Sequence, residues 1–182
     1  AQAIYNGNYA EQKHPTAPIS PEFTATIGDY SINLNWNNEA ENSIDYLTGE
    51  NDFQGYKIYR SIDNGVTWGD LVFNYEGEHV GWNPINQFDL VDNISGLDSL
   101  APWFNLGNNT GIQYSMIDSN LFSYREYCYS VTAYDSGLEP DWVLNENDDL
   151  LNFEDGYIPL ESNIGVNMLC LSPRIQNIYI PP

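Results

Sequence analysis

Apolar and polar residues alternate with a period of two along six segments of this chain. The segments are 23–27, 31–36, 56–61, 112–117, 127–134 and 166–171. They are rich in Tyr, Ile, Val and Thr, and turn-forming residues separate them. Such alternation is typical of β-strands with one buried face. Because no amphipathic helix pattern of useful length intervenes, we predict an all-β fold built as an antiparallel sandwich.

Size and charge narrow the classes of function. The chain has 182 residues, of which 42% are apolar, and this is enough for one domain with a substantial core. No apolar run approaches the roughly 18 residues of a membrane-spanning helix. Asp and Glu total 26 against five Lys and Arg, a formal net charge of −21. Nucleic acid and anionic membranes require clustered basic residues, so we expect neither as a partner. The charge predicts either solubility by self-repulsion or the binding of cations.

Several segments also resemble one protein family. They are APISPEFTATI (17–27), YSINLNW (30–36), DFQGYKIYRS (52–61) and LESNIGVNMLCLSP (160–173). Trp36 stands where that family keeps its core tryptophan. Over residues 17–173 the chain resembles the fibronectin type III domains of secreted bacterial surface proteins. The resemblance implies an immunoglobulin-like antiparallel β-sandwich in an extracellular or cell-surface protein. Around it we expect strand-like extensions at 1–16 and 174–182 and long insertions at 37–52, 69–110 and 135–161.

The most specific part of the resemblance is the approach to the segment 127–134. Leu121 precedes Tyr127 by six residues, as in the tyrosine corner of the family, where the tyrosine hydroxyl bonds back to nearby backbone. With Tyr127 facing inward, alternation sends Tyr129, Val131 and Ala133 to the core as well. The residues expected on the outward face are Cys128, Ser130, Thr132 and Tyr134.

A second motif follows the segment 56–61. Residues 61–68 read SIDNGVTW, which resembles the Asp-box, a small hairpin on the blades of sialidase propellers. Asp63 can accept backbone N–H groups across the turn, Gly65 can supply a positive φ, and Trp68 can pack over the loop. These three roles stabilise the turn and involve no catalysis. We therefore interpret the motif as a structural hairpin leading into the next strand.

Catalytic motifs are absent from the sequence. No nucleophile elbow, zinc-protease helix, phosphate loop or dinucleotide fingerprint occurs. His14 and His79 have no Cys or second His at the spacing of metal ligands. A sialidase would need several blades and an arginine triad, beyond what Arg60, Arg125 and Arg174 provide. We predict a protein that is not an enzyme.

Two acidic loops contain the residues that favour calcium. Ca²⁺ takes six to eight oxygen ligands from carboxylates, amides and carbonyls. The candidate ligands are Asp45, Glu50, Asp52, Asp135, Asp141, Asn145, Asn147 and Asp149. The spacing is not that of an EF-hand, because Leu150 stands where its glycine is required and Gly156 where its bidentate glutamate is. The alternative is a solvated acidic loop without an ordered ion.

Two cysteines occur, Cys128 and Cys170. The strands that hold them lie side by side in the family that the chain resembles, so the resemblance implies that a cross-strand disulfide can form. Secretion would favour such a bond. The alternative is two separate thiols, with Cys170 pointing into the core beside Val166 and Met168.

The two terminal segments carry the functional hypothesis. AIYNGNY (3–9) and IQNIYI (175–180) both have the composition of strands and lie outside the sandwich. A strand added to the sheet edge of an identical subunit is a heterologous contact that grows into rings or filaments. We predict a homo-oligomeric structural subunit of an extracellular filament, sheath or surface layer, joined through its terminal strands. The alternative for the termini is that each packs on its own domain.

A recognition module is the second hypothesis. Four aromatic residues in the inserted loops can stack on sugars or anchor the loops against the sandwich. They are Trp82, Trp103, Phe104 and Trp142. On this reading the chain is an adhesin or a carbohydrate-binding appendage of a larger secreted protein, with a glycan or another cell-surface molecule as its partner. A third hypothesis is that the chain is a spacer beside a catalytic domain.

Overall fold

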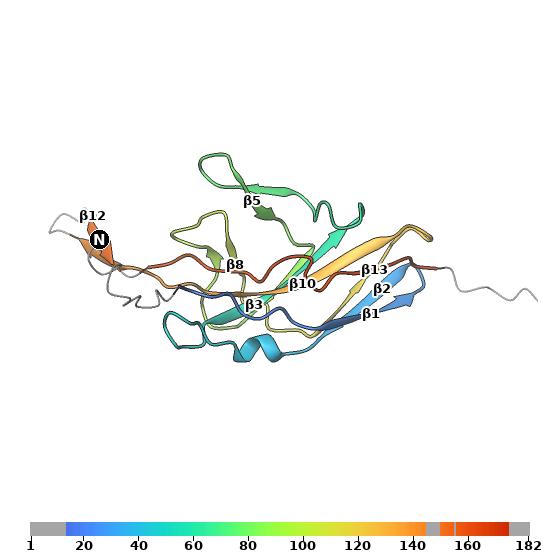
Figure 1. The fold of residues 1–182 in the computed structure, drawn as a ribbon, viewed down its shortest axis with the longest axis horizontal. Helices are drawn as coiled ribbons and strands as arrows, with labels where there is room; N and C mark the ends of the chain where they lie inside the picture. Colours follow the sequence, from blue (N-terminus) through green and yellow to red (C-terminus); the bar gives the residue numbers. More distant parts are fainter. Residues whose placement is uncertain (1–13, 145–149, 155, 175–182) are drawn as a thin grey trace, which may run out of the picture.

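Each of the six alternating segments contains a strand, and every strand pairing is antiparallel (Figure 1). The computed structural model describes residues 14–144, 150–154 and 156–174. One sheet has the order β1-β2-β9 and the other the order β13-β10-β3-β6. The strands of these two sheets are β1 (Phe23–Gly28), β2 (Ser31–Trp36), β9 (Ser115–Asp118), β13 (Leu169–Leu171), β10 (Tyr127–Asp135), β3 (Phe53–Ser61) and β6 (Asn86–Asp89). The all-β, antiparallel prediction is confirmed, and the arrangement is that of a β-sandwich.

The strand boundaries differ from the predicted ones at three places. β3 begins three residues early, at Phe53, and β9 begins three residues late, at Ser115. β13 keeps only the last three residues of the predicted segment 166–171. There the side-chain amide of Asn167 donates to the carbonyl oxygens of Val131, at 2.8 Å, and Pro21, at 2.7 Å. A side chain thus bonds the neighbouring backbone where a strand would have used its own N–H groups.

The hydrophobic core lies between the two sheets. The three-stranded sheet contributes residues from β1 and β2, and the four-stranded sheet contributes residues from β3 and β10. The buried members on these strands are Phe23, Ile32, Leu34, Trp36, Phe53, Tyr56, Ile58, Tyr127, Tyr129, Val131 and Ala133. Ile32 and Leu34 have no exposed surface, and each contributes about 1.5–3 kcal/mol by burial. Alternation along β10 therefore placed Tyr127, Tyr129, Val131 and Ala133 correctly.

The outward face of the four-stranded sheet is covered as well. All nine residues of β10 are buried, including those predicted to face outward. The Tyr134 hydroxyl donates to the Leu106 carbonyl at 2.7 Å, and the Thr132 hydroxyl donates to Glu161 at 2.6 Å. These residues lie outside the core between the sheets, as predicted, but other parts of the chain fold back over them and bury them. The inserted segment 69–110 contains the short strands β4 (Leu71–Phe73), β5 (His79–Trp82), β7 (Gly96–Leu97) and β8 (Asn105–Gly107).

The remaining elements lie outside the two main sheets. The 3₁₀ helix η1 (Glu39–Asn42) follows β2 and buries Ala40. β11 (Asp141–Leu144) and β12 (Leu150–Glu154) pair with each other and project at one end of the long axis (Figure 1). The turn between β1 and β2 lies toward the opposite end. Within the described ranges, no helix has the length and apolar character needed to cross a bilayer.

Candidate functional site

A groove opens on the outward face of the four-stranded sheet. It has a volume of about 570 Å³. Lys57 and Tyr59 of β3 form its floor, and β4 and β5 provide Val72, His79 and Trp82 along one side. Trp103 and Phe104, just before β8, and the segment 158–164 complete it. The groove thus brings together four segments that are far apart in sequence.

The polar part of the floor is a buried ion pair. Lys57 Nζ lies 3.0 Å from Glu161 Oε2, and the other carboxylate oxygen accepts the Thr132 hydroxyl. The same ammonium lies 3.5 Å from the centre of the Phe104 ring, which provides a cation–π contact. Burial lowers the pKa of Lys57, and the attraction of Glu161 opposes that shift. The two charges cancel, so the floor is polar without carrying net charge.

Aromatic side chains line the sides of the groove. The His79 and Trp82 rings meet edge to face with centroids 4.6 Å apart. Trp103 meets the exposed Tyr75 in the same manner, at 5.6 Å. These contacts hold the two half-buried tryptophans in defined orientations. Three of the four aromatic residues predicted for recognition therefore lie at one site. The fourth, Trp142, is on β11.

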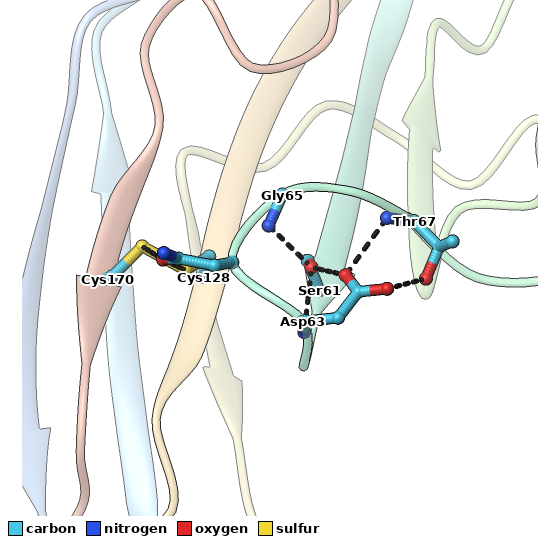
Figure 2. The surroundings of a disulfide bond; sticks show 7 residues. Ser61, Asp63, Gly65, Thr67, Cys128 and Cys170 are labelled. Atoms are coloured by element: carbon cyan, nitrogen blue, oxygen red, sulfur yellow. Dashed lines mark hydrogen bonds between the residues drawn. A yellow bond between two sulfur atoms is a disulfide. The ribbon is translucent and has the colours of Figure 1, made fainter.

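A second core cluster supports the groove from beneath. Its buried members are Tyr59, Trp68 and Cys128, and the partly buried Trp82 and Ile164 pack against it. Cys128 and Cys170 are directly opposite each other on β10 and β13 and form a disulfide (Figure 2). The structure therefore contains the cross-strand disulfide that the resemblance implied, and not two separate thiols. Since Tyr59, Trp82 and Ile164 also line the groove, the disulfide and the groove share one packed layer.

The Asp-box-like segment closes on itself beside this disulfide (Figure 2). Asp63 accepts the Thr67 backbone N–H at 2.9 Å and the Ser61 and Thr67 hydroxyls at 2.6 Å each. These bonds lower the pKa of Asp63 to about 2. Gly65 has φ +84°, as predicted, and Trp68 is buried. The prediction of a hairpin into the next strand was wrong, because β4 pairs with β5 and not with β3.

The hydroxyl of Tyr127 accepts the backbone N–H of Phe122 at 3.0 Å. This is the bond predicted from the spacing of Leu121 and Tyr127, and both residues are buried. The bond ties the loop before β10 to the end of the sandwich. It positions the loop 119–126 rather than the groove.

The candidate calcium ligands are only partly brought together. Asp45 is buried and acts as a loop cap, because its carboxylate accepts the N–H groups of Thr16, Leu47 and Thr48. Burial acts to raise the pKa of Asp45, but these hydrogen bonds outweigh it and the pKa is lowered. Glu50 is exposed. Asp141 lies on β11, whereas Asn145, Asn147 and Asp149 lie outside the described residues.

Asp52 and Asp135 lie together where β3 pairs with β10. The Ser136 N–H donates to the Asp52 carbonyl, and the Tyr157 hydroxyl donates to the Asp52 carboxylate at 3.1 Å. Asp135 Oδ1 accepts two backbone N–H groups, but its buried Oδ2 has no hydrogen-bond partner. Burial, followed by repulsion from Asp52, raises the pKa of Asp135 to about 7. Among the described residues, no three His, Cys, Asp or Glu side chains form a group that could hold a metal ion. Calcium binding stays a prediction.

The two histidines occupy separate places. His14 is exposed, and His79 lies on the groove, where its Nε2 is 2.8 Å from the Gly81 carbonyl oxygen.

Comparison of the chain with known family models, curated proteins and solved structures found no match.

Proposed function

We propose that this chain is a non-enzymatic, extracellular recognition module whose groove binds a neutral saccharide. The observation that carries the proposal is the combination of Trp82 and Trp103 at the sides with the neutralised Lys57–Glu161 pair on the floor. Ligand sites are typically concave, mostly apolar and furnished with a few fixed polar groups. The groove has this composition and a volume within the usual range for such sites.

The charges of the chain and of the groove favour an uncharged ligand. The whole chain carries a formal charge of −21, so an anionic ligand approaches against repulsion. A cation would need an unpaired carboxylate in the groove, but both oxygens of Glu161 already accept hydrogen bonds. Sugar rings present apolar faces that suit tryptophan rings and hydroxyls that suit polar groups such as Asn163 and the backbone of 158–164.

We also propose that the sandwich is of the fibronectin type III kind. The division into β1-β2-β9 and β13-β10-β3-β6 supports this assignment. So does the bond from the Phe122 N–H to the Tyr127 hydroxyl, which has the form of a tyrosine corner. The inserted loops then provide most of the sides of the groove, so its ligand does not follow from the fold.

A glycan array followed by calorimetry tests the saccharide proposal. We expect binding to one or more neutral oligosaccharides, and we expect Trp103→Ala and Trp82→Ala each to weaken it at least about tenfold, the equivalent of 1.4 kcal/mol. Phe122→Ala is the matched control, since Phe122 is an exposed aromatic residue that does not line the groove. An array without signals, or unchanged affinity in both tryptophan variants, would contradict the proposal.

The structural-subunit hypothesis stays a prediction. Residues 1–13 and 175–182, which would supply the terminal strands, lie outside the described residues. The hypothesis predicts that deletion of 1–12 or of 174–182 leaves a folded monomer that no longer assembles. Electron microscopy of the purified chain and of both truncated chains provides the test, and normal assembly of the truncated chains would contradict the hypothesis.

A further inference from the structure

The turn between β4 and β5 exposes an aromatic residue beside the groove. Tyr75 is 79% exposed, the largest fraction among the large apolar side chains that the structure describes. β4 and β5 pair with each other, and their hairpin projects from the body of the sandwich (Figure 1). Tyr75 does not itself line the groove, but its ring meets that of Trp103, which does, with centroids 5.6 Å apart. The aromatic surface of the groove therefore continues outward onto the turn.

A second series of rings reaches the same turn along the hairpin. Trp82 contacts His79 in the groove, and the His79 ring in turn lies 6.1 Å from the ring of Phe73, measured between centroids. Phe73 is 50% exposed. Phe73 and Tyr75 are two positions apart, so their Cα atoms lie within about 7 Å of each other. Both series of rings thus leave the groove and end at the tip of one hairpin.

Hydrogen bonds fix the turn that carries Tyr75. The side-chain oxygen of Asn74 accepts the Glu76 N–H at 3.0 Å and the Glu78 N–H at 2.9 Å. Gly77 donates its N–H to the Asn74 carbonyl at 3.1 Å and has φ 80°, which glycine adopts without penalty. None of these bonds uses the Tyr75 side chain, so the turn does not depend on an aromatic residue. The turn presents the ring in a fixed place, which lowers the entropy lost when a ligand binds.

The charges of the turn favour a neutral ligand, as those of the groove do. Residues 69–78 contain Asp70, Glu76 and Glu78 and no Lys or Arg. An anionic ligand would be repelled here. A ligand with hydroxyl groups can donate hydrogen bonds to the exposed carboxylate of Glu76. A neutral saccharide that leaves the groove across Tyr75 therefore meets an apolar ring flanked by hydrogen-bond acceptors.

We propose that Tyr75 forms an outer subsite, which holds a further sugar ring of a linear neutral oligosaccharide whose other rings occupy the groove. This inference rests on the saccharide proposal above and adds that the ligand is a chain of several sugars. The exposed ring offers apolar surface that one more sugar face can cover. Because the sugars are covalently linked, the outer one binds at a high effective concentration once the others are in place. Affinity therefore rises with chain length until the outer subsite is filled.

Calorimetry with oligosaccharides of increasing length tests the outer subsite. The probes are neutral linear series, the cello-, manno- and xylo-oligosaccharides from disaccharide to hexasaccharide. We expect the affinity of the wild type to rise along the series that binds. We expect Tyr75→Ala to weaken binding of the hexasaccharide at least about fivefold and to leave the affinity for the disaccharide within about twofold. Its melting temperature should not change, because the turn is held by Asn74 and the backbone.

Three further variants separate the outer subsite from the groove. Tyr75→Phe keeps the ring and should keep the gain with chain length. Phe122→Ala removes an exposed aromatic residue that does not line the groove and should change neither affinity. Trp82→Ala should weaken binding of short and long chains alike, because Trp82 lines the groove itself.

Two outcomes would overturn the outer subsite while leaving saccharide binding in the groove intact. One is a wild-type affinity that does not depend on chain length. The other is a Tyr75→Ala variant that binds the disaccharide and the hexasaccharide with equally changed, or equally unchanged, affinity. Failure of the wild type to bind any of the three series at any length would overturn the saccharide proposal and the outer subsite together.

Discussion

Lys57 Nζ and Glu161 Oε2 lie 3.0 Å apart beneath the groove, on side chains that are only 6% and 16% exposed. The two residues are 104 positions apart in sequence. Their bond joins β3 to the segment that leads toward β13 and thereby fixes one side of the groove to its floor. A buried ion pair adds little stability over apolar residues of similar volume, but loss of one partner leaves the other charge uncompensated.

We therefore expect Glu161→Gln to lower the free energy of unfolding by about 3 kcal/mol or more. The double variant Lys57→Met/Glu161→Gln should recover much of this loss, because no buried charge remains. Urea denaturation of the wild type, both single variants and the double variant measures the coupling between the two residues. Strictly additive effects of the two substitutions would show that the pair does not act as a unit.

The Cys128–Cys170 disulfide closes a sequence separation of 42 residues. On the loop-entropy estimate it stabilises the folded chain by about 4 kcal/mol. We expect Cys128→Ser/Cys170→Ser to lower the free energy of unfolding by an amount of this order. We also expect a reductant to shift the urea midpoint of the wild type but not that of the variant. Equal midpoints for the oxidised and reduced wild type would contradict this.

The sequence predicted the core of the fold better than its surface, for a physical reason. Alternation along β10 identifies inward residues such as Tyr129, Val131 and Ala133, because the period of a strand is two. The short strands β4, β5, β7 and β8 of the inserted segment have only two to four residues each, too few for a period to emerge. Thr132 is covered by Glu161 and Tyr134 by Leu106 of β8, so the burial of these two residues could not be predicted from β10 itself.

The candidate site was predicted in part for a similar reason. Trp82, Trp103 and Phe104 were recognisable as aromatic residues in inserted loops, yet their convergence depends on tertiary packing. Lys57 was missed altogether as a groove residue. A lysine in the middle of an apolar strand is a weak signal for a buried pair, but the partner, Glu161, has no sequence signature.

Gly65 is required by both its backbone and its surroundings. It has φ +84°, and a Cβ there would lie 2.7 Å from the sulfur of Met168. Gly49 has a similar φ of +74° but open space around its missing Cβ. We expect Gly49→Ala to cost about 1 kcal/mol from the backbone alone and Gly65→Ala to cost measurably more. Thermal or urea unfolding of the two variants separates the two contributions, and equal losses would show that Met168 moves aside freely.

Asp135 should make the fold less stable as the pH rises from about 4 to about 7. Burial raises its pKa in the folded chain to about 7, from an ordinary value of 3.8. Between these values the folded chain holds a proton that the unfolded chain releases, so each step up in pH favours unfolding. The slope from one such group is at most about 1.4 kcal/mol per pH unit. Asp45 and Asp63, whose pKa values are lowered, act in the opposite sense at more acidic pH.

Asp135→Asn isolates this contribution, because Asn keeps the oxygen that accepts the Gly137 and Leu160 N–H groups. We expect the stability of the variant relative to the wild type to increase steadily across the pH window and to level off above it. Urea unfolding at a series of pH values gives this difference directly. A chelator belongs in every sample, because a calcium ion bound at Asp135 and Asp52 would keep the carboxylate ionised and flatten the profile. Parallel pH profiles for the two proteins in chelator would mean that Asp135 does not hold its proton in the folded state.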